Sequence, residues 1–180
     1  MRCRAILAAM GLVAWAGSAW ADVCVWRDPE RTMAQLFPEA RDYRTAIHKL
    51  TPAQATRVAT LAGQPLTPDE TQEFNIYEIT DGKGVIGKVL ALAGPGEYGT
   101  IETVIGIGAD DRIRGVYIQR IRERQRAAVQ SDAFLGQFKG QSLTPELKVT
   151  PPTDAGKPAQ VVIALVRKML AFDRVLSTAP

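Results

Sequence analysis

The spacing of apolar residues changes along the chain from a helical period to a strand period. Between residues 28 and 62, apolar side chains recur every three or four positions, as in amphipathic helices. This spacing predicts three short helices, with apolar positions at Met33, Leu36 and Phe37, at Tyr43, Ile47 and Leu50, and at Val58 and Leu61. Asp28 and Pro29 suit the start of the first helix, and Thr51 and Pro52 suit the start of the third. Gly63 ends the third helix, and residues 63–71 are expected to form a polar link.

Residues 74–121 follow a strand-like pattern instead. Apolar stretches alternate with short polar joints, of which Asp81-Gly82 is typical of a tight turn. The stretches cover residues 74–79, 84–92, 100–107 and 113–121. Successive strands joined by short turns pair antiparallel, so the sequence predicts a largely antiparallel sheet.

The last third of the chain returns to a helical period. A helix is expected at about residues 127–138, a short edge strand at 147–149 and a proline-rich loop at 150–158. Residues 159–176 form the strongest helical pattern, with Arg167, Lys168 and Asp173 on its outward side. The predicted fold class is therefore α+β, a largely antiparallel sheet with helices packed against it.

The first 21 residues have the features of an export signal. Arg2 and Arg4 precede a short apolar stretch, and Ala19-Trp20-Ala21 has the small-x-small pattern of a cleavage site. The apolar stretch is shorter than the ~20 residues of a membrane-spanning helix, although an uncleaved anchor is the alternative. We therefore expect an export signal at 1–21, a helical lead-in at 22–72 and the main domain at 73–176.

Composition excludes several classes of function. Loss of Arg2 and Arg4 with the export signal lowers the formal net charge from +3 to +1, which gives no indication of nucleic-acid binding. Cys24 would be the single cysteine left, so an internal disulfide is excluded, and it is either a small apolar side chain or a redox-active or intermolecular thiol. His48 is the one histidine, which argues against a histidine or cysteine metal site. No nucleophile–base pair is evident, so no catalytic residue is assigned.

Two glycine-containing segments have features of a ligand site. Gly96 in the turn Gly94–Gly99 allows close approach of the backbone to a flat ring, and Tyr98 could stack on it. The alternative is a wide hairpin connection that needs positive φ angles. Gly156 and Lys157 begin the closing helix, where free N–H groups and a full positive charge suit a phosphate. The alternative is a plain helix start.

Arginine recurs at every second position from Arg120 to Arg126. If the preceding strand continues through this segment, all four arginine side chains project to one side. They could then bind a phosphate, an acidic redox partner or anionic lipid head groups. The alternative is a solvated face, with Glu123 offsetting part of the charge.

The order of these segments from Phe74 to Arg174 resembles the FMN-binding domain family. That family includes the flavin-carrying subunits of the sodium-translocating NADH:quinone reductase and of the Rnf complex. The matching segments are 84–87, the GPGEYG turn at 94–99, 104–108, 112–116 and 134–140. The resemblance implies an electron-transfer domain in the periplasm. The resemblance and the two glycine-containing segments described above together give these candidate cofactor-binding residues: Gly96, Tyr98, Glu123, Thr153, Gly156 and Lys157.

The chain departs from that family at two points. Members with covalent FMN carry a Ser-Gly-Ala-Thr motif before the last helix, and its threonine is esterified. Pro158 takes the threonine position here and has no hydroxyl, while Thr153 is displaced. The family's Glu-Thr-x-Gly loop reads Glu123-Arg124-Gln125-Arg126, without the glycine. We therefore expect any FMN to be held non-covalently.

The resemblance also sets the expected role of the protein. It implies a periplasmic electron carrier or accessory subunit rather than an enzyme acting alone. Its partner would be a membrane-bound or periplasmic redox protein, and association with the membrane surface is compatible with the arginine-rich segment. The alternative is a flavin-free binding module of a membrane redox complex on the same fold.

Overall fold

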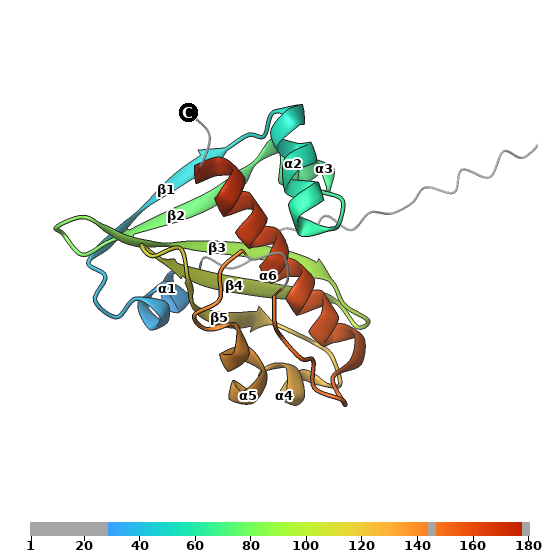
Figure 1. The fold of residues 1–180 in the computed structure, drawn as a ribbon. Helices are drawn as coiled ribbons and strands as arrows, with labels where there is room; N and C mark the ends of the chain where they lie inside the picture. The colour runs from blue at the N-terminus through green and yellow to red at the C-terminus, as the bar shows by residue number, and fades with distance from the viewer. Residues whose placement is uncertain (1–28, 144–146, 178–180) are drawn as a thin grey trace, which may run out of the picture.

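The computed structural model describes residues 29–143 and 147–177. Their centre is an antiparallel sheet of five strands in the order β1-β2-β3-β4-β5 (Figure 1). The strands are β1 Asp42–His48, β2 Phe74–Thr80, β3 Val85–Pro95, β4 Thr100–Gly108 and β5 Ile113–Arg120. Each strand pairs with the next along the chain, because short turns join most of them. The predicted α+β class with an antiparallel sheet is confirmed.

Helices lie on both faces of this sheet. The helical elements are α1 Glu30–Leu36, α2 Pro52–Ala62, α3 Pro68–Gln72, α4 Arg126–Val129, α5 Asp132–Leu135, the 3-10 helix η1 Gly136–Phe138 and α6 Gly156–Ser177. The long helix α6 runs diagonally across one face, and α2 lies beside it (Figure 1). Helix α5 and η1 lie beside β5. The strands β3 and β5 finish at the same end of the sheet, because each runs antiparallel to β4 between them.

Two apolar clusters, one on each face, hold these layers together. Under α6, Val166 and Met169 are buried with Ile105, and the rings of Phe74 and Phe172 stack with centroids 3.8 Å apart. On the opposite face, α1 packs through a smaller cluster that contains Met33, Leu36, Phe37, Val89 and Val104. Burial of apolar surface on both faces is the main stabilising contribution to this arrangement.

A strand replaces the second predicted helix. Tyr43 and Ile47 were expected on one face of a helix, but residues 42–48 form β1 and pair with β2 along its full length. The prediction was wrong because the spacing of these few apolar residues fits both periods. Hydrogen bonding to β2 decides between them, and β1 then forms an edge of the sheet in which Ile47 is 68% exposed.

Other helices differ from prediction in extent. Leu61 was expected to share a buried face with Val58, but it is 40% exposed, and Ala62 packs inward instead. The polar link at 63–71 contains the start of α3, which Thr67 caps. The helix expected at 127–138 is divided into α4, α5 and η1, because the Ser131 side chain caps a new helix start. No strand forms at 147–149, where Leu147 is buried in loop conformation.

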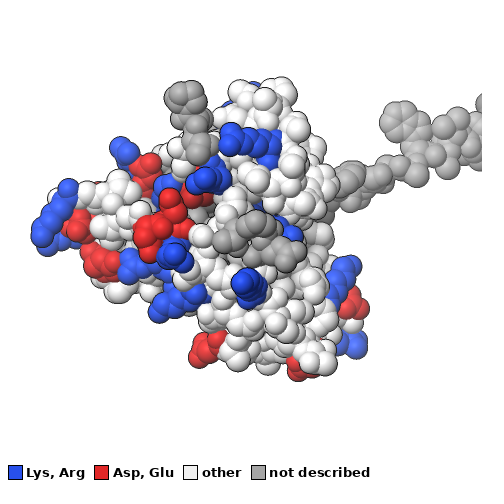
Figure 2. Space-filling view, viewed as in Figure 1, with Lys and Arg blue, Asp and Glu red and all other residues white. Residues whose placement is uncertain are grey.

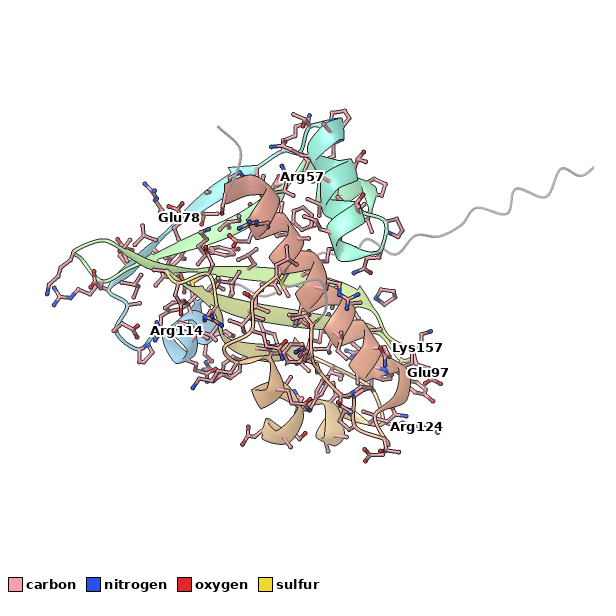
Figure 3. All side chains as sticks on the ribbon, in the orientation of Figure 1. Arg57, Glu78, Glu97, Arg114, Arg124 and Lys157 are labelled. Atoms are coloured by element: carbon pink, nitrogen blue, oxygen red, sulfur yellow. The ribbon has the colours of Figure 1, made fainter. Side chains whose placement is uncertain are left out.

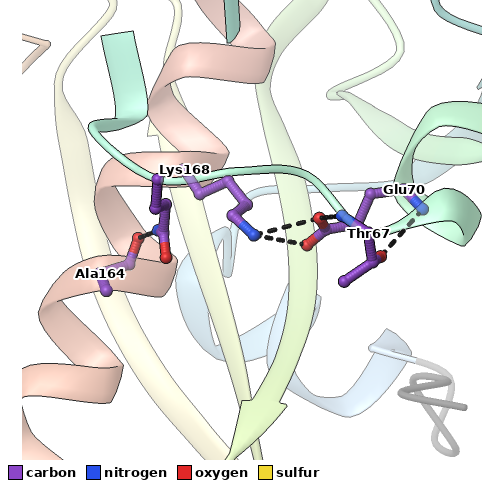
Figure 4. A network of polar contacts seen from close by, with 5 residues as sticks. Thr67, Glu70, Ala164 and Lys168 are labelled. Carbon is purple, nitrogen blue, oxygen red and sulfur yellow. Dashed lines mark hydrogen bonds and ion pairs between the residues drawn. The ribbon is translucent and has the colours of Figure 1, made fainter. Parts of the chain in front are cut away.

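Helix α6 carries two buried charged residues that were expected to face outward. Lys168 is 6% exposed and Asp173 is 7% exposed. Lys168 pairs with Glu70 at the start of α3 (Figure 4), and Asp173 pairs with Lys88 of β3. These ion pairs satisfy the buried charges and connect α6 to the lead-in and to the sheet. The outward placement of both residues was therefore wrong.

The expected export signal, its cleavage site before Asp22, Cys24 and Asp28 lie outside the described residues. Within residues 29–143 and 147–177, none of the helices is both long and apolar enough to span a membrane.

Candidate functional site

Glu123 fixes the glycine-rich turn between β3 and β4. Its side chain is almost completely buried, and its Oε1 atom accepts hydrogen bonds from the backbone N–H groups of Glu97, at 2.9 Å, and Tyr98, at 3.1 Å. The Gly96 N–H donates to the Gly99 carbonyl at 2.7 Å. A Cβ atom on Gly96 would lie 2.1 Å from Glu123 Oε1, so only glycine allows this carboxylate to reach the turn.

The second carboxylate oxygen of Glu123 has no hydrogen-bond partner. Glu123 Oε2 is buried, and Oε1 of nearby Gln125 is buried and without a partner as well. Buried acceptors that lack a donor cost free energy, and such atoms are rare in native proteins. Four other buried side-chain atoms of the described residues also lack a partner: Asn75 Oδ1, Glu102 Oε2, Thr103 Oγ1 and Gln119 Oε1. The two acceptors at residues 123–125 are the ones beside the glycine turn, and a ligand with N–H or O–H donors would reach them only after a movement of this loop.

Tyr98 lies at the surface of the same turn. Its side chain is 43% exposed, and the Arg124 guanidinium lies 5.1 Å from the centre of its ring. Partial burial of the phenol raises the pKa of Tyr98 above its ordinary value of 10.0, and the nearby Glu97 carboxylate raises this pKa further. Tyr98 is therefore a neutral aromatic group at physiological pH, with one ring face occupied by a cation.

The leading end of α6 lies at the same end of the sheet. A Cβ atom on Gly94, at the end of β3, would lie 3.2 Å from the side chain of Leu165 and 3.3 Å from that of Val161, so β3 packs on the first turns of α6. Figure 3 shows Lys157, Glu97 and Arg124 together at this end. The hydrogen bonds to Glu123 join the turn to the loop after β5, and the packing of Gly94 on Val161 and Leu165 places the end of β3 beside α6, whose start lies at the same end of the sheet in Figure 3.

The start of α6 has the features that favour an anion. Gly156 adopts φ +50°, Lys157 is exposed, and the helix that follows is 22 residues long. Free N–H groups and the helix dipole place partial positive charge here, and Lys157 adds a full charge. Pro158 is buried in the first turn, and Thr153 is exposed on the loop before the helix.

The structure thus brings Gly96, Tyr98 and Glu123 into direct contact and places Gly156 and Lys157 at the same end of the sheet. Thr153 belongs to the loop that leads into this helix start. Sequence reasoning missed Gln125 as a candidate ligand-binding residue. Its position two residues after Glu123 was the one signal that could have indicated it.

The arginine-rich segment does not continue the strand. β5 ends at Arg120, whose Nη1 lies 3.5 Å from Oε1 of the fully buried Glu102. Arg122, Arg124 and Arg126 follow in the loop and at the start of α4, and all three are exposed. Arg120 is therefore a structural cation, and the expected row of four aligned arginines is reduced to three in the loop.

Two hollows lie along the outer edge of β5, away from this region. One of about 460 Å³ and one of about 430 Å³ share Arg114, Gly115, Tyr117 and Lys139 in their linings, and Arg112 lines the larger. The turn and the start of α6 line neither hollow. The candidate site is accordingly a surface region of exposed cations and the Tyr98 ring, with the unpartnered Glu123 and Gln125 acceptors buried beside it. Within the described residues, no three His, Cys, Asp or Glu side chains are grouped so as to hold a metal ion.

Comparison with known proteins gives no assignment: the chain matches no protein-family model and no curated protein.

Proposed function

We propose that this protein is an exported FMN-binding electron-transfer protein that holds the flavin without a covalent bond. The observation that supports this most directly is the buried Glu123 carboxylate. One of its oxygens fixes the glycine turn, and the other has no partner. The cationic start of a long helix lies at the same end of the sheet.

The chemistry of these residues fits FMN. The flavin N3–H and the ribityl hydroxyls are donors that would satisfy Glu123 Oε2 and Gln125 Oε1, two buried acceptors that FMN would reach after a movement of the loop at residues 123–125. The FMN phosphate is a dianion, which the N–H groups at the start of α6 and the Lys157 ammonium would bind. Tyr98 offers an exposed aromatic surface beside the turn. These acceptors, the cationic helix start and the Tyr98 ring support the site assignment made from the sequence.

A covalent phosphoester is disfavoured by the residues at the start of α6. Pro158 has no hydroxyl and is buried in the first helical turn, and Thr153 precedes the helix by several residues on an exposed loop. Any flavin is therefore held by hydrogen bonds, charge and stacking alone.

Bound FMN would supply reversible one- and two-electron chemistry, and the protein would control its surroundings. Glu123 holds the turn in place through two backbone hydrogen bonds. Lys157 would neutralise part of the phosphate charge. These are binding and orienting roles, which suit a carrier or accessory component of a membrane-bound or periplasmic redox system.

The test is a visible absorption spectrum followed by FMN titration. Protein expressed with its export signal should be yellow or should bind added FMN, and the colour should be lost on denaturation. Lys157→Glu should weaken FMN binding by about tenfold or more, since it replaces an attraction to the phosphate by a repulsion. Lys83→Glu is the matched control, because Lys83 is exposed in the turn at the opposite end of β3.

Equal FMN affinities for the two lysine variants would remove the phosphate site from the start of α6. A colourless protein that also fails to bind FMN would refute the function. Colour that persists on a denaturing gel would refute the absence of a covalent bond.

A flavin-free binding module on the same scaffold is the second candidate. The hydrogen bonds within the turn favour it, because Glu123 already accepts the N–H groups of Glu97 and Tyr98 and leaves neither of them for a flavin. The two hollows along β5 also lie outside the proposed flavin site. The FMN titration separates the two functions, because only the carrier binds flavin.

A further inference from the structure

We infer that Arg122, Arg124 and Arg126, together with Tyr98, form a docking surface for an acidic protein. We call these four residues the arginine surface. The inference that this surface contacts the electron-transfer partner rests on the proposed function. Its recognition of acidic protein surfaces can be measured without flavin.

Arg122 and Arg124 lie against the turn that Glu123 holds, and Arg126 follows at the start of α4. A Cβ atom on Gly99 would lie 3.7 Å from Arg122 Cδ, and Arg124 lies over the Tyr98 ring. The Arg126 N–H donates to the Glu123 carbonyl at 3.2 Å, which ties the start of α4 to the same loop. The arginine surface is thus built on a backbone that is fixed by hydrogen bonds, which reduces the entropy lost on binding.

The charges of this surface are not neutralised within the described residues. The ion pairs there use Arg44, Lys88, Arg114, Arg120 and Lys168, and none includes an arginine of this surface. Figure 3 labels Lys157, Glu97 and Arg124 at one end of the molecule, and Figure 2 shows basic side chains beside an acidic one at that same end.

Glu97 is the exposed carboxylate of the adjoining turn, whereas Glu123 is buried. The turn and the loop thus carry three exposed arginines and one exposed carboxylate, and the excess positive charge attracts an acidic partner.

A protein partner fits this surface better than a lipid membrane. Guanidinium groups form paired hydrogen bonds with carboxylates, and exposed arginine and tyrosine are enriched among residues that dominate protein interfaces. A helix or loop that binds a membrane surface also inserts apolar side chains. In the arginine surface, Tyr98 is the one large exposed side chain with apolar character. The other large exposed apolar residues of the described chain lie outside this surface: Ile47, Leu61, Val85 and Tyr117.

The test measures binding of a fluorescently labelled polyglutamate peptide to the flavin-free protein by anisotropy. We expect binding at low ionic strength that weakens with added salt. Arg122→Glu/Arg124→Glu should weaken it at least tenfold. Arg31→Glu/Arg57→Glu is the control, because it makes the same change of net charge at exposed positions on α1 and α2. This control should bind the peptide like the wild type, apart from a small loss caused by the lower net charge. Arg122→Gln/Arg124→Gln should show a smaller loss, and circular dichroism confirms that each variant is folded.

Equal peptide affinities for the two double glutamate variants would overturn the inference. It would also be overturned if the protein sedimented with phosphatidylglycerol vesicles through Arg122 and Arg124 but did not bind the peptide, which would identify a lipid surface instead. Neither measurement needs FMN, so failure of docking and failure of flavin binding give separate results.

Discussion

Replacing Lys168 by methionine should destabilise the fold far more than removing an exposed cation does. Lys168 Nζ lies 3.0 Å from both carboxylate oxygens of Glu70, and the two side chains are 8% and 10% exposed (Figure 4). Glu70 also accepts the Thr67 N–H at 2.7 Å and so caps α3. The ion pair therefore connects α3, and the lead-in before β2, to the centre of α6.

The size of the loss follows from burial. Removing one partner of a buried ion pair costs about 3–5 kcal/mol of unfolding free energy, because an uncompensated charge stays behind. Glu70 keeps its hydrogen bond from Thr67 after the substitution, so we expect the lower end, about 3 kcal/mol. With a denaturant dependence of about 2 kcal/mol per M, the urea midpoint should fall by about 1.5 M.

Urea unfolding followed by circular dichroism measures this loss. Glu70→Gln/Lys168→Met removes both charges, so it should be more stable than Lys168→Met alone by about 1–2 kcal/mol. Arg44→Met is the control, because Arg44 pairs with Glu78 while 74% exposed, and its loss should stay below about 1 kcal/mol. The reasoning is refuted if Lys168→Met and Arg44→Met cost the same, or if the double variant is no more stable than Lys168→Met.

Three further outcomes are expected. Gly96→Ala should lower stability by about 1–3 kcal/mol in thermal unfolding, because its Cβ would overlap Glu123, whereas Gly84→Ala, whose Cβ meets nothing within 4 Å, should change it by less than about 0.5 kcal/mol. Hydrogen bonds from two backbone N–H groups lower the pKa of Asp81 below its ordinary value of 3.8. The Asp81 carboxylate therefore stabilises the fold fully at pH values above 3.8, and this stabilisation is lost as the pH falls through the lower pKa of the folded state. Melting temperatures of wild type and Asp81→Asn should therefore converge at acid pH, and a gap that stays constant would contradict this. The phenol of Tyr98 should ionise above 10.0 in an alkaline absorbance titration compared against Tyr98→Phe, and ionisation at or below that value would contradict its raised pKa.

The sheet could be predicted from the sequence because its strands and turns carry local signals. The predicted strand at 113–121 and the observed β5, Ile113–Arg120, agree closely. Apolar side chains and polar joints recur at short range in this part of the chain, and short turns leave antiparallel pairing as the simple arrangement. Tertiary contacts were not needed to find these elements.

Features that depend on residues far apart in the sequence could not be predicted in the same way. β1 exists because residues 42–48 bond to β2, whereas their own apolar spacing fits a helix equally well. Lys168 is buried because Glu70, 98 residues earlier, neutralises it, and Asp173 is buried because Lys88, 85 residues earlier, does the same. A helical pattern assigns charged residues to solvent unless such partners are known.

The candidate site combines both kinds of information. The glycine turn and the helix start were visible in the sequence, but the hydrogen bonds from Glu97 and Tyr98 to Glu123 depend on β5 returning the chain to the end of the sheet where that turn lies. They also depend on the missing side chain of Gly96, which leaves space for the carboxylate. The local pattern therefore indicated the parts of the site but not the residue that joins them.

The position of Glu123 between Arg122 and Arg124 has a consequence for both proposals. Its carboxylate holds the turn of the proposed flavin site, and through that turn it also positions Tyr98 of the arginine surface, over which Arg124 lies. Glu123→Ala should therefore impair FMN binding and polyglutamate binding together, because the turn and the loop lose their shared anchor. Lys157→Glu should impair FMN binding selectively, and Arg122→Glu/Arg124→Glu should mainly impair peptide binding. If Glu123→Ala left either affinity unchanged in a folded protein, that surface would be formed independently of this carboxylate.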